Sequence, residues 1–110
     1  MEKLLEQTLL YDFYGELLTE HQKQIYEDVV LNDYTLSEVA QERGISRQGV
    51  HDLIKRCNRI LQEYEAKLHL VERFLTIKSR IEEMEHTLRD TEAPDKERLI
   101  RQLQDILENL

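Results

Sequence analysis

The chain has few of the residues that break or cross-link a polypeptide. Its 110 residues include three glycines, one proline, one cysteine and no tryptophan. Sandwiches and barrels need many turns, so this scarcity argues against them and predicts an all-α fold with long helices. The single cysteine, Cys57, cannot form a disulfide within the chain, which suits a reducing compartment.

Long apolar runs and secretory features are also missing. No uninterrupted apolar stretch approaches the roughly 18 residues of a membrane-spanning helix. The N-terminal MEKLLEQTLLYDF has one lysine followed by acidic residues, so it lacks the basic start of a signal peptide. We therefore expect a cytoplasmic protein without a membrane span. Apolar residues form 40% of the chain, which is enough for one modest packed core.

Charge is distributed unevenly along the chain, whose formal net charge is -8. Residues 1–45 have a balance of -7, residues 46–80 a balance of +4, and residues 81–110 a balance of -5. A polyanion would therefore be attracted only to the central band.

Helical periodicity and capping signals divide the first 45 residues into three predicted helices. In the first, apolar residues recur every four positions at Leu5, Leu9, Phe13 and Leu17, and Leu10 and Tyr14 lie beside them on the same apolar face. A capping box at residues 19–22 opens a second helix that we expect to end near Leu31. Another capping box at residues 35–38 opens a third, which Gly44 ends by adopting the left-handed conformation.

A long helix is predicted from Ser46 onward, because no strong breaker follows until Pro94. The sequence leaves open whether this helix is continuous or broken near residues 76–79. Residues 91–95 form a linker, and the last helix carries a narrow apolar seam of Leu99, Leu103, Ile106 and Leu110. These features suggest a helix-turn-helix region over residues 1–61 and a helical extension over residues 62–110.

The narrow seam needs a surface to pack against. It could fold onto the preceding helix or onto the N-terminal helix of its own chain, leaving a monomer. A two-fold dimer would cover the apolar area that a long hairpin leaves exposed, so we favour a homodimer.

A helix-turn-helix pattern lies in TLSEVAQERGISRQGVHDLIKRC, residues 35–57. Ala40 is small enough for the closest crossing of two helices, Gly44 supplies the tight turn, and Ser46 caps the second helix. Four apolar residues, Val39, Ile45, Val50 and Leu53, are expected to form a wedge that holds the two helices together.

The second helix of this pattern has the side chains expected of a recognition helix. Arg47, Gln48, His51, Asp52 and Lys55 occupy positions that touch base edges, and Arg56 and Arg59 are better placed for phosphates. Asp52 is unusual there, because a carboxylate repels phosphate unless it accepts from a cytosine amino group. We call these seven residues the reading face.

The segment LLTEHQKQIYEDVVLNDYTLSEVAQERGISRQGVHDLIKRCNRIL, residues 17–61, resembles region 4 of bacterial sigma factors, which reads the promoter -35 element. The whole chain is more closely similar to the YlxM-like family of small bacterial helix-turn-helix proteins. This resemblance implies a sigma-region-4-like fold and a regulatory role near the signal recognition particle pathway. The latter link is an association suggested by neighbouring genes for the particle and its receptor.

Several partners fit these residues. The reading face could bind DNA for regulation, or a structured RNA such as that of the signal recognition particle. The chain could also assist the particle's GTPase, or the three-helix unit could bind protein alone, as the overall acidity suggests.

No pattern in the sequence indicates an enzyme, a cofactor or a metal site. There is no glycine-rich phosphate loop and no nucleophile elbow. The four histidines show no metal-ligand spacing, and Cys57 fits a small buried apolar residue better than a reactive thiol.

Overall fold

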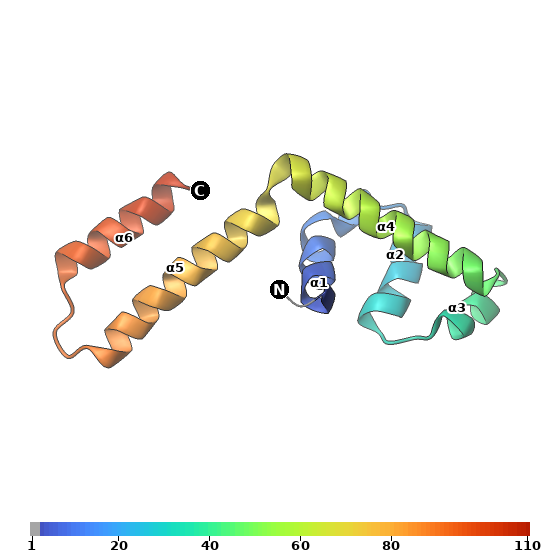
Figure 1. The fold of residues 1–110 in the computed structure, drawn as a ribbon, viewed down its shortest axis with the longest axis horizontal. Helices are drawn as coiled ribbons and strands as arrows, with labels where there is room; N and C mark the ends of the chain where they lie inside the picture. The colour runs from blue at the N-terminus through green and yellow to red at the C-terminus, as the bar shows by residue number, and fades with distance from the viewer. Residues whose placement is uncertain (1–2) are drawn as a thin grey trace. The chain divides into compact units, whose positions relative to one another are not determined.

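The computed structural model describes residues 3–110 as helices joined by short turns (Figure 1). In chain order these are α1 (Lys3–Tyr14), η1 (Gly15–Leu17), α2 (Glu20–Tyr26), η2 (Glu27–Leu31), α3 (Leu36–Arg43), α4 (Arg47–Leu68), α5 (Leu70–Asp90) and α6 (Lys96–Glu108). Within this range there is no β-strand, so the predicted all-α class is confirmed. None of these helices combines the length and apolarity that crossing a membrane requires.

The chain divides into two compact units, and the boundary along the sequence lies between His69 and Leu70. The division suggested by the sequence, after residue 61, lies inside α4. His69 adopts a left-handed conformation with φ of 57°, and its N–H bonds to the carbonyl of Glu65. This residue interrupts the predicted long helix, and residues 76–79 remain helical. Histidine is among the non-glycine residues that adopt this conformation most readily. The helix can therefore break here without a glycine or a proline.

The predicted caps of the first unit are confirmed. Thr19 and Thr35 each form both hydrogen bonds of a capping box, with Gln22 and Glu38 respectively. The second predicted helix ends its α-helical part at Tyr26 and reaches Leu31 through η2, a π-helical turn. Local side-chain chemistry therefore sets where these segments begin.

The core takes only part of the apolar face predicted for the first helix. Leu10 and Tyr14 of that face are buried at 3% and 1% exposure, whereas Leu5, Phe13 and Leu17 are exposed. A stripe spaced every four residues rotates by about 40° at each step around a helix with 3.6 residues per turn. The stripe therefore cannot stay on the core, and Leu10 and Tyr14 form the buried side of α1.

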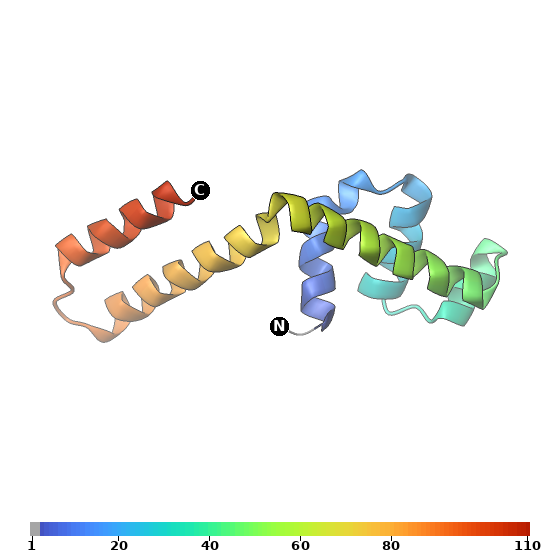
Figure 2. The ribbon, with the colours of Figure 1, turned by 45° about the horizontal axis from the view of Figure 1, so that its top comes forward.

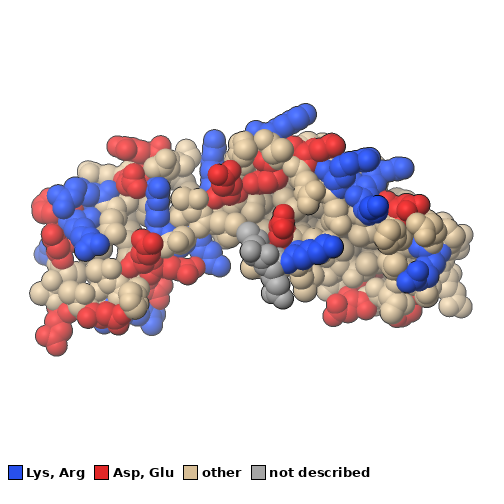
Figure 3. All heavy atoms as spheres, in the orientation of Figure 1, with Lys and Arg blue, Asp and Glu red and all other residues tan. Residues whose placement is uncertain are grey.

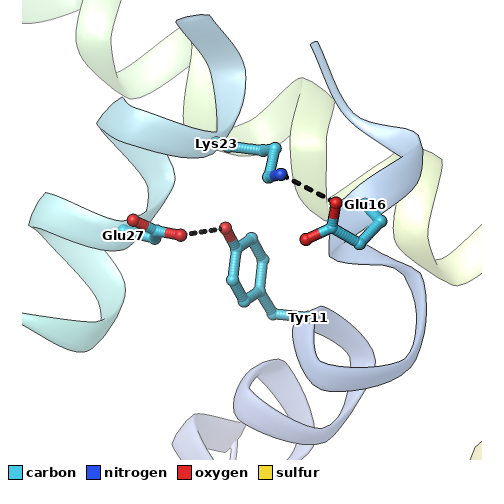
Figure 4. A network of polar contacts seen from close by, with 4 residues as sticks. All are labelled: Tyr11, Glu16, Lys23 and Glu27. Carbon is cyan, nitrogen blue, oxygen red and sulfur yellow. Dashed lines mark hydrogen bonds and ion pairs between the residues drawn. The ribbon is translucent and has the colours of Figure 1, made fainter. Parts of the chain in front are cut away.

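Two polar contacts connect α1 to η2 and η1 to α2 (Figure 4). The hydroxyl of Tyr11 donates to Glu27 at 2.5 Å, and the ammonium of Lys23 donates to Glu16 at 3.0 Å. Burial, followed by the bond to Glu27, raises the pKa of Tyr11. A Cβ at Gly15 would lie 2.9 Å from the Tyr11 ring, so glycine is needed for this close approach.

Helix α4 packs against α1, α2 and α3, and it lies beside all three in both ribbon views (Figures 1 and 2). The core around the helix-turn-helix consists of Ile25, Val39, Ala40 and Val50, with Val29, Leu36, Leu53 and Ile54 packed against it. Of the predicted wedge, Val39 and Val50 are fully buried and Leu53 is half-buried. Ile45 is 37% exposed, because it lies in the turn outside the crossing.

The second unit is a hairpin of α5 and α6 (Figure 1). The two helices run antiparallel, with Arg80 and Asp105 forming an ion pair of 2.9 Å between them. Asp95 caps α6, so the predicted linker over residues 91–95 is confirmed. Of the predicted seam, Ile106 is buried and Leu99 half-buried, while Leu103 and Leu110 are exposed.

Candidate nucleic-acid interface

The turn between α3 and α4 has the geometry that a helix-turn-helix requires. Gly44 is left-handed, with φ of 68°, and the N–H groups of Gly44 and Ile45 both bond to the carbonyl of Ala40. Ser46 caps α4 by accepting from the N–H of Gly49 at 2.9 Å. Ala40 is 8% exposed within the core between the two helices, so a larger side chain there would push them apart.

Arg43 attaches α3 to the preceding segment. Its guanidinium donates to Gln24 at 2.9 Å and to Asp28 at 3.3 Å. The side chains of Arg43 and Asp28 are 28% and 18% exposed, so this ion pair is partly shielded from water. Such a pair fixes geometry more than it adds stability. Helix α3 is therefore held from two sides, by the core and by Arg43.

The buried side of α4 is continuous through its first four turns. Val50, Cys57 and Leu61 are each 0% exposed, so the prediction of a buried Cys57 is confirmed. Burial raises the pKa of the Cys57 thiol to about 11, which keeps it protonated and unreactive at neutral pH. Asn58 accepts hydrogen bonds from Tyr26 at 2.6 Å and from Gln7 at 3.3 Å, which ties α4 to α2 and α1. Burial raises the pKa of Tyr26 to about 12.

The opposite side of α4 carries the seven residues of the reading face. All of them are exposed: Arg47, Gln48, His51, Asp52, Lys55, Arg56 and Arg59. At about 100° per residue, Gln48, Lys55 and Arg59 lie within roughly 40° of one another around the helix. Arg47 and Arg56 flank this stripe on its two sides.

Only some of these side chains are engaged with one another. Gln48 donates to Asp52 at 2.9 Å, and His51 lies 3.6 Å from the same carboxylate oxygen. Arg59 is 4.0 Å from Glu63, in a pair that is mostly exposed and therefore weak. Within residues 3–110, the cations of Arg47, Lys55 and Arg56 form no ion pair. Figure 3 shows basic side chains gathered along α4, with acidic ones beside them.

Two shallow hollows lie on this part of the unit. One is lined by Asp52, Lys55, Arg56 and Arg59. The other lies between the start of α2 and α4, and is lined by Thr19, His21, Gln22, Gly49, Asp52, Leu53 and Arg56. The start of α2 was not among the predicted site residues. Its capping box shows where α2 begins, but not that the fold brings it beside Arg56.

The helix-turn-helix geometry agrees with the comparison to known families. The model of the family UPF0122, described as "Putative helix-turn-helix protein, YlxM / p13 like", matches residues 1–106. The chain belongs to this family. The resemblance stated from the sequence is therefore confirmed.

Relatives in several bacteria match most of the chain. A UPF0122 protein of Caldanaerobacter subterraneus is 45% identical over 87 residues, which cover 79% of this chain and 74% of that protein. One of Acetivibrio thermocellus is 46% identical, covering 86% of this chain and 79% of its own. One of Halalkalibacterium halodurans is 37% identical over 110 residues, covering 100% of this chain and 95% of its own.

Proposed function

We propose that this protein is a cytoplasmic regulator that binds duplex DNA through the reading face of α4. The observation that carries the proposal is an exposed polar and basic stripe on a helix whose other side is fixed in the core of a helix-turn-helix. A recognition helix must be both exposed and rigid, because base edges are read by side chains held in register with the groove.

The residues of the reading face have different roles in this proposal. Arg47, Gln48 and Lys55 reach base edges in the major groove, where arginine and lysine suit guanine and an amide suits adenine. Arg56 and Arg59 contact phosphates, which set position and carry no sequence information themselves. Gln48 must exchange its bond to Asp52 for a base, so the correct site has to supply a better partner.

The overall acidity fits a reader that holds only well-matched sites. Most negative charge lies in residues 1–45 and 81–110, outside the central band. Repulsion from these regions weakens non-specific attraction to DNA, so base contacts decide the affinity.

The proposal is tested by replacing Arg47 and Lys55 with alanine. We expect specific duplex binding to be lost, because each good base contact contributes about 1–3 kcal/mol of discrimination. Gel-shift titration of the protein on a selected duplex measures this. Unchanged affinity would contradict the assignment.

A matched control removes two exposed cations from α6, with Arg98 and Arg101 replaced by alanine. This double variant loses the same charge as the test variant, so it reports the general electrostatic effect. We expect its specific affinity to stay close to that of the parent protein. Equal losses in both variants would show that net charge alone governs binding.

The class of nucleic acid is determined by capture of the tagged protein from bacterial lysate, with and without nuclease. Recovery of defined DNA that is lost on nuclease treatment supports the proposal. Recovery of a structured RNA, such as that of the signal recognition particle, would replace DNA with RNA as the ligand. A protein partner that survives nuclease would make α4 a protein-docking helix, which contradicts the proposal.

A further inference from the structure

The hairpin of α5 and α6 leaves a set of large apolar side chains exposed. They include Ile81 and Leu88 on α5, which are 50% and 51% exposed and lie seven residues apart. On α6 they include Ile100, Leu103 and Leu107, exposed by 47%, 51% and 67%, and Leu110, just beyond the end of α6 at Glu108, is 73% exposed. These four are spaced three, four and three apart. We call these six residues the hairpin face. Their spacing is that of helices that pack side by side.

The five helical residues of the hairpin face lie on the same side of the hairpin. Met84 and Ile106, each 8% exposed, mark the buried side of α5 and α6. From Met84, Ile81 and Leu88 are displaced by roughly 40–60° in one rotational sense, taking about 100° per residue. From Ile106, the three residues on α6 are displaced by roughly 60–120° in the same sense. In an antiparallel pair, displacements of the same sense fall on the same side of the two helices.

The other side of the hairpin is polar. Arg80, Glu83, Gln102 and Asp105 line a shallow hollow there, and all are displaced in the opposite sense from Met84 and Ile106. The ion pair between Arg80 and Asp105 joins the two helices directly, at 2.9 Å. The hairpin is therefore apolar on one side only, so the exposed apolar residues are not scattered singly.

We infer that the hairpin face binds the hairpin face of a second copy of this chain, forming a four-helix bundle. The six leave an apolar patch on the order of the largest one on a typical soluble monomer, roughly 300–600 Å², and a patch of that size with a polar rim often marks a protein interface. Each copy would supply a large part of the roughly 800 Å² that one partner buries in a standard stable interface.

A second copy fits this surface because a two-fold interface needs a self-complementary patch. Two antiparallel hairpins with apolar sides facing each other form the usual core of a four-helix bundle. The rim also carries both signs of charge, since Lys78, Glu85 and Lys96 fall on this side of the hairpin at about 100° per residue. Two identical rims can therefore meet without placing charges of one sign only against each other.

The inferred interface differs from the seam expected from the sequence. Leu99 and Ile106 are partly or fully buried within the hairpin, so they are not free for a partner. Leu103 and Leu110 remain available, joined by Ile81, Leu88, Ile100 and Leu107, which were not part of the predicted seam. The inference goes beyond the proposed function and does not depend on nucleic-acid binding.

Sedimentation velocity on the full chain, without nucleic acid, tests the inference. We expect the parent protein to sediment as a dimer, at twice its 13.2 kDa mass. Leu107→Lys should weaken self-association by roughly a hundredfold or more, because two-fold symmetry removes two buried leucines from one interface. Gln104→Lys is the matched control, since it adds the same side chain to the outer side of α6. It should leave the dimer intact.

A second pair of variants tests the α5 part of the face. Ile81→Lys should dissociate the dimer, and Ser79→Lys, on the far side of α5, should not. Circular dichroism checks that each variant keeps its helices. A parent protein that stays monomeric at all concentrations used for DNA binding would overturn the inference, as would a dimer that survives both Leu107→Lys and Ile81→Lys. A stable dimer that binds no nucleic acid would refute the proposed function alone.

Discussion

At the scale of single residues, Asp52 is the one member of the reading face whose charge opposes binding to nucleic acid. Its side chain is 64% exposed in the middle of the reading face, and it accepts from Gln48 at 2.9 Å. Its negative charge repels the phosphates of DNA. Its carboxylate also accepts the hydrogen bond of the Gln48 amide, which is then not free to contact a base. Affinity for any duplex is therefore lower than the four cations of the reading face alone would give.

Asp52→Asn should raise the affinity for random-sequence duplex DNA by roughly two- to fivefold. The amide oxygen still accepts from Gln48, so only the charge is lost, and an exposed charge contributes up to about 1 kcal/mol. Fluorescence anisotropy at fixed low salt measures the change. Asp12→Asn, an exposed position on α1, is the control and should have little effect. If Asp52→Asn instead weakens binding to a specific site, Asp52 accepts from a cytosine there.

At the scale of structural elements, the α3–α4 turn depends on one backbone conformation. Gly44 has φ of 68°, and a Cβ built there meets no atom within 4 Å. The space is open, so any cost of a side chain comes from the backbone and not from a clash. This separates conformational strain from packing, which substitutions in a core rarely allow.

Gly44→Ala should lower the free energy of unfolding by about 1–2 kcal/mol, because alanine is strained in the left-handed conformation. Gly44→Asn should cost less, since asparagine enters that region more readily. Urea denaturation followed by circular dichroism measures both. Equal stability of the parent protein and Gly44→Ala would show that the turn can relax without glycine.

Elements also show which parts of the fold could be predicted from the sequence. The caps at Thr19, Thr35 and Ser46 were predictable, because a side chain that bonds its own helix end depends on nearby residues alone. The break at His69 was not, because nothing in the sequence there excludes a helix. The buried side of α1 depends on which neighbours it meets, and the sequence does not contain that information directly.

The candidate site divides in the same way. The exposure of the reading face follows from the register of α4, which Ser46 and the apolar residues Val50 and Leu53 set. The bond between Gln48 and Asp52 and the nearness of His21 to Arg56 follow from three-dimensional packing. Helix register is encoded locally, whereas contacts between elements require the whole fold.

At the scale of the whole molecule, the two proposed binding surfaces lie on different helices. The basic band lies mainly on α4, and the hairpin face lies on α5 and α6. Binding of a polyanion and association of two copies are therefore expected to use different physical forces. Salt weakens polyanion binding by screening the charges, but it has little effect on an association that buries apolar surface.

Salt should therefore weaken DNA binding without weakening self-association. Binding by the four cations of one reading face gives a slope of about -3.6 for log affinity against log salt, and a dimer engaging both faces gives about -7. Self-association should be unchanged or strengthened by salt, because each copy carries a net charge of -8. Anisotropy and sedimentation in the same buffers measure both. A flat slope for DNA would contradict phosphate contacts, and a dimer lost in salt would contradict an apolar interface.

The linker between α5 and α6 has a practical consequence for engineering. Residues 91–95 are outside the helices, and four of the five are exposed. Loop-closure entropy rises slowly with length, by only about 0.6 kcal/mol for each doubling. An epitope tag or a fluorophore-binding peptide inserted there would therefore leave both helices of the hairpin in register, and would label the protein without altering either its reading face or its hairpin face.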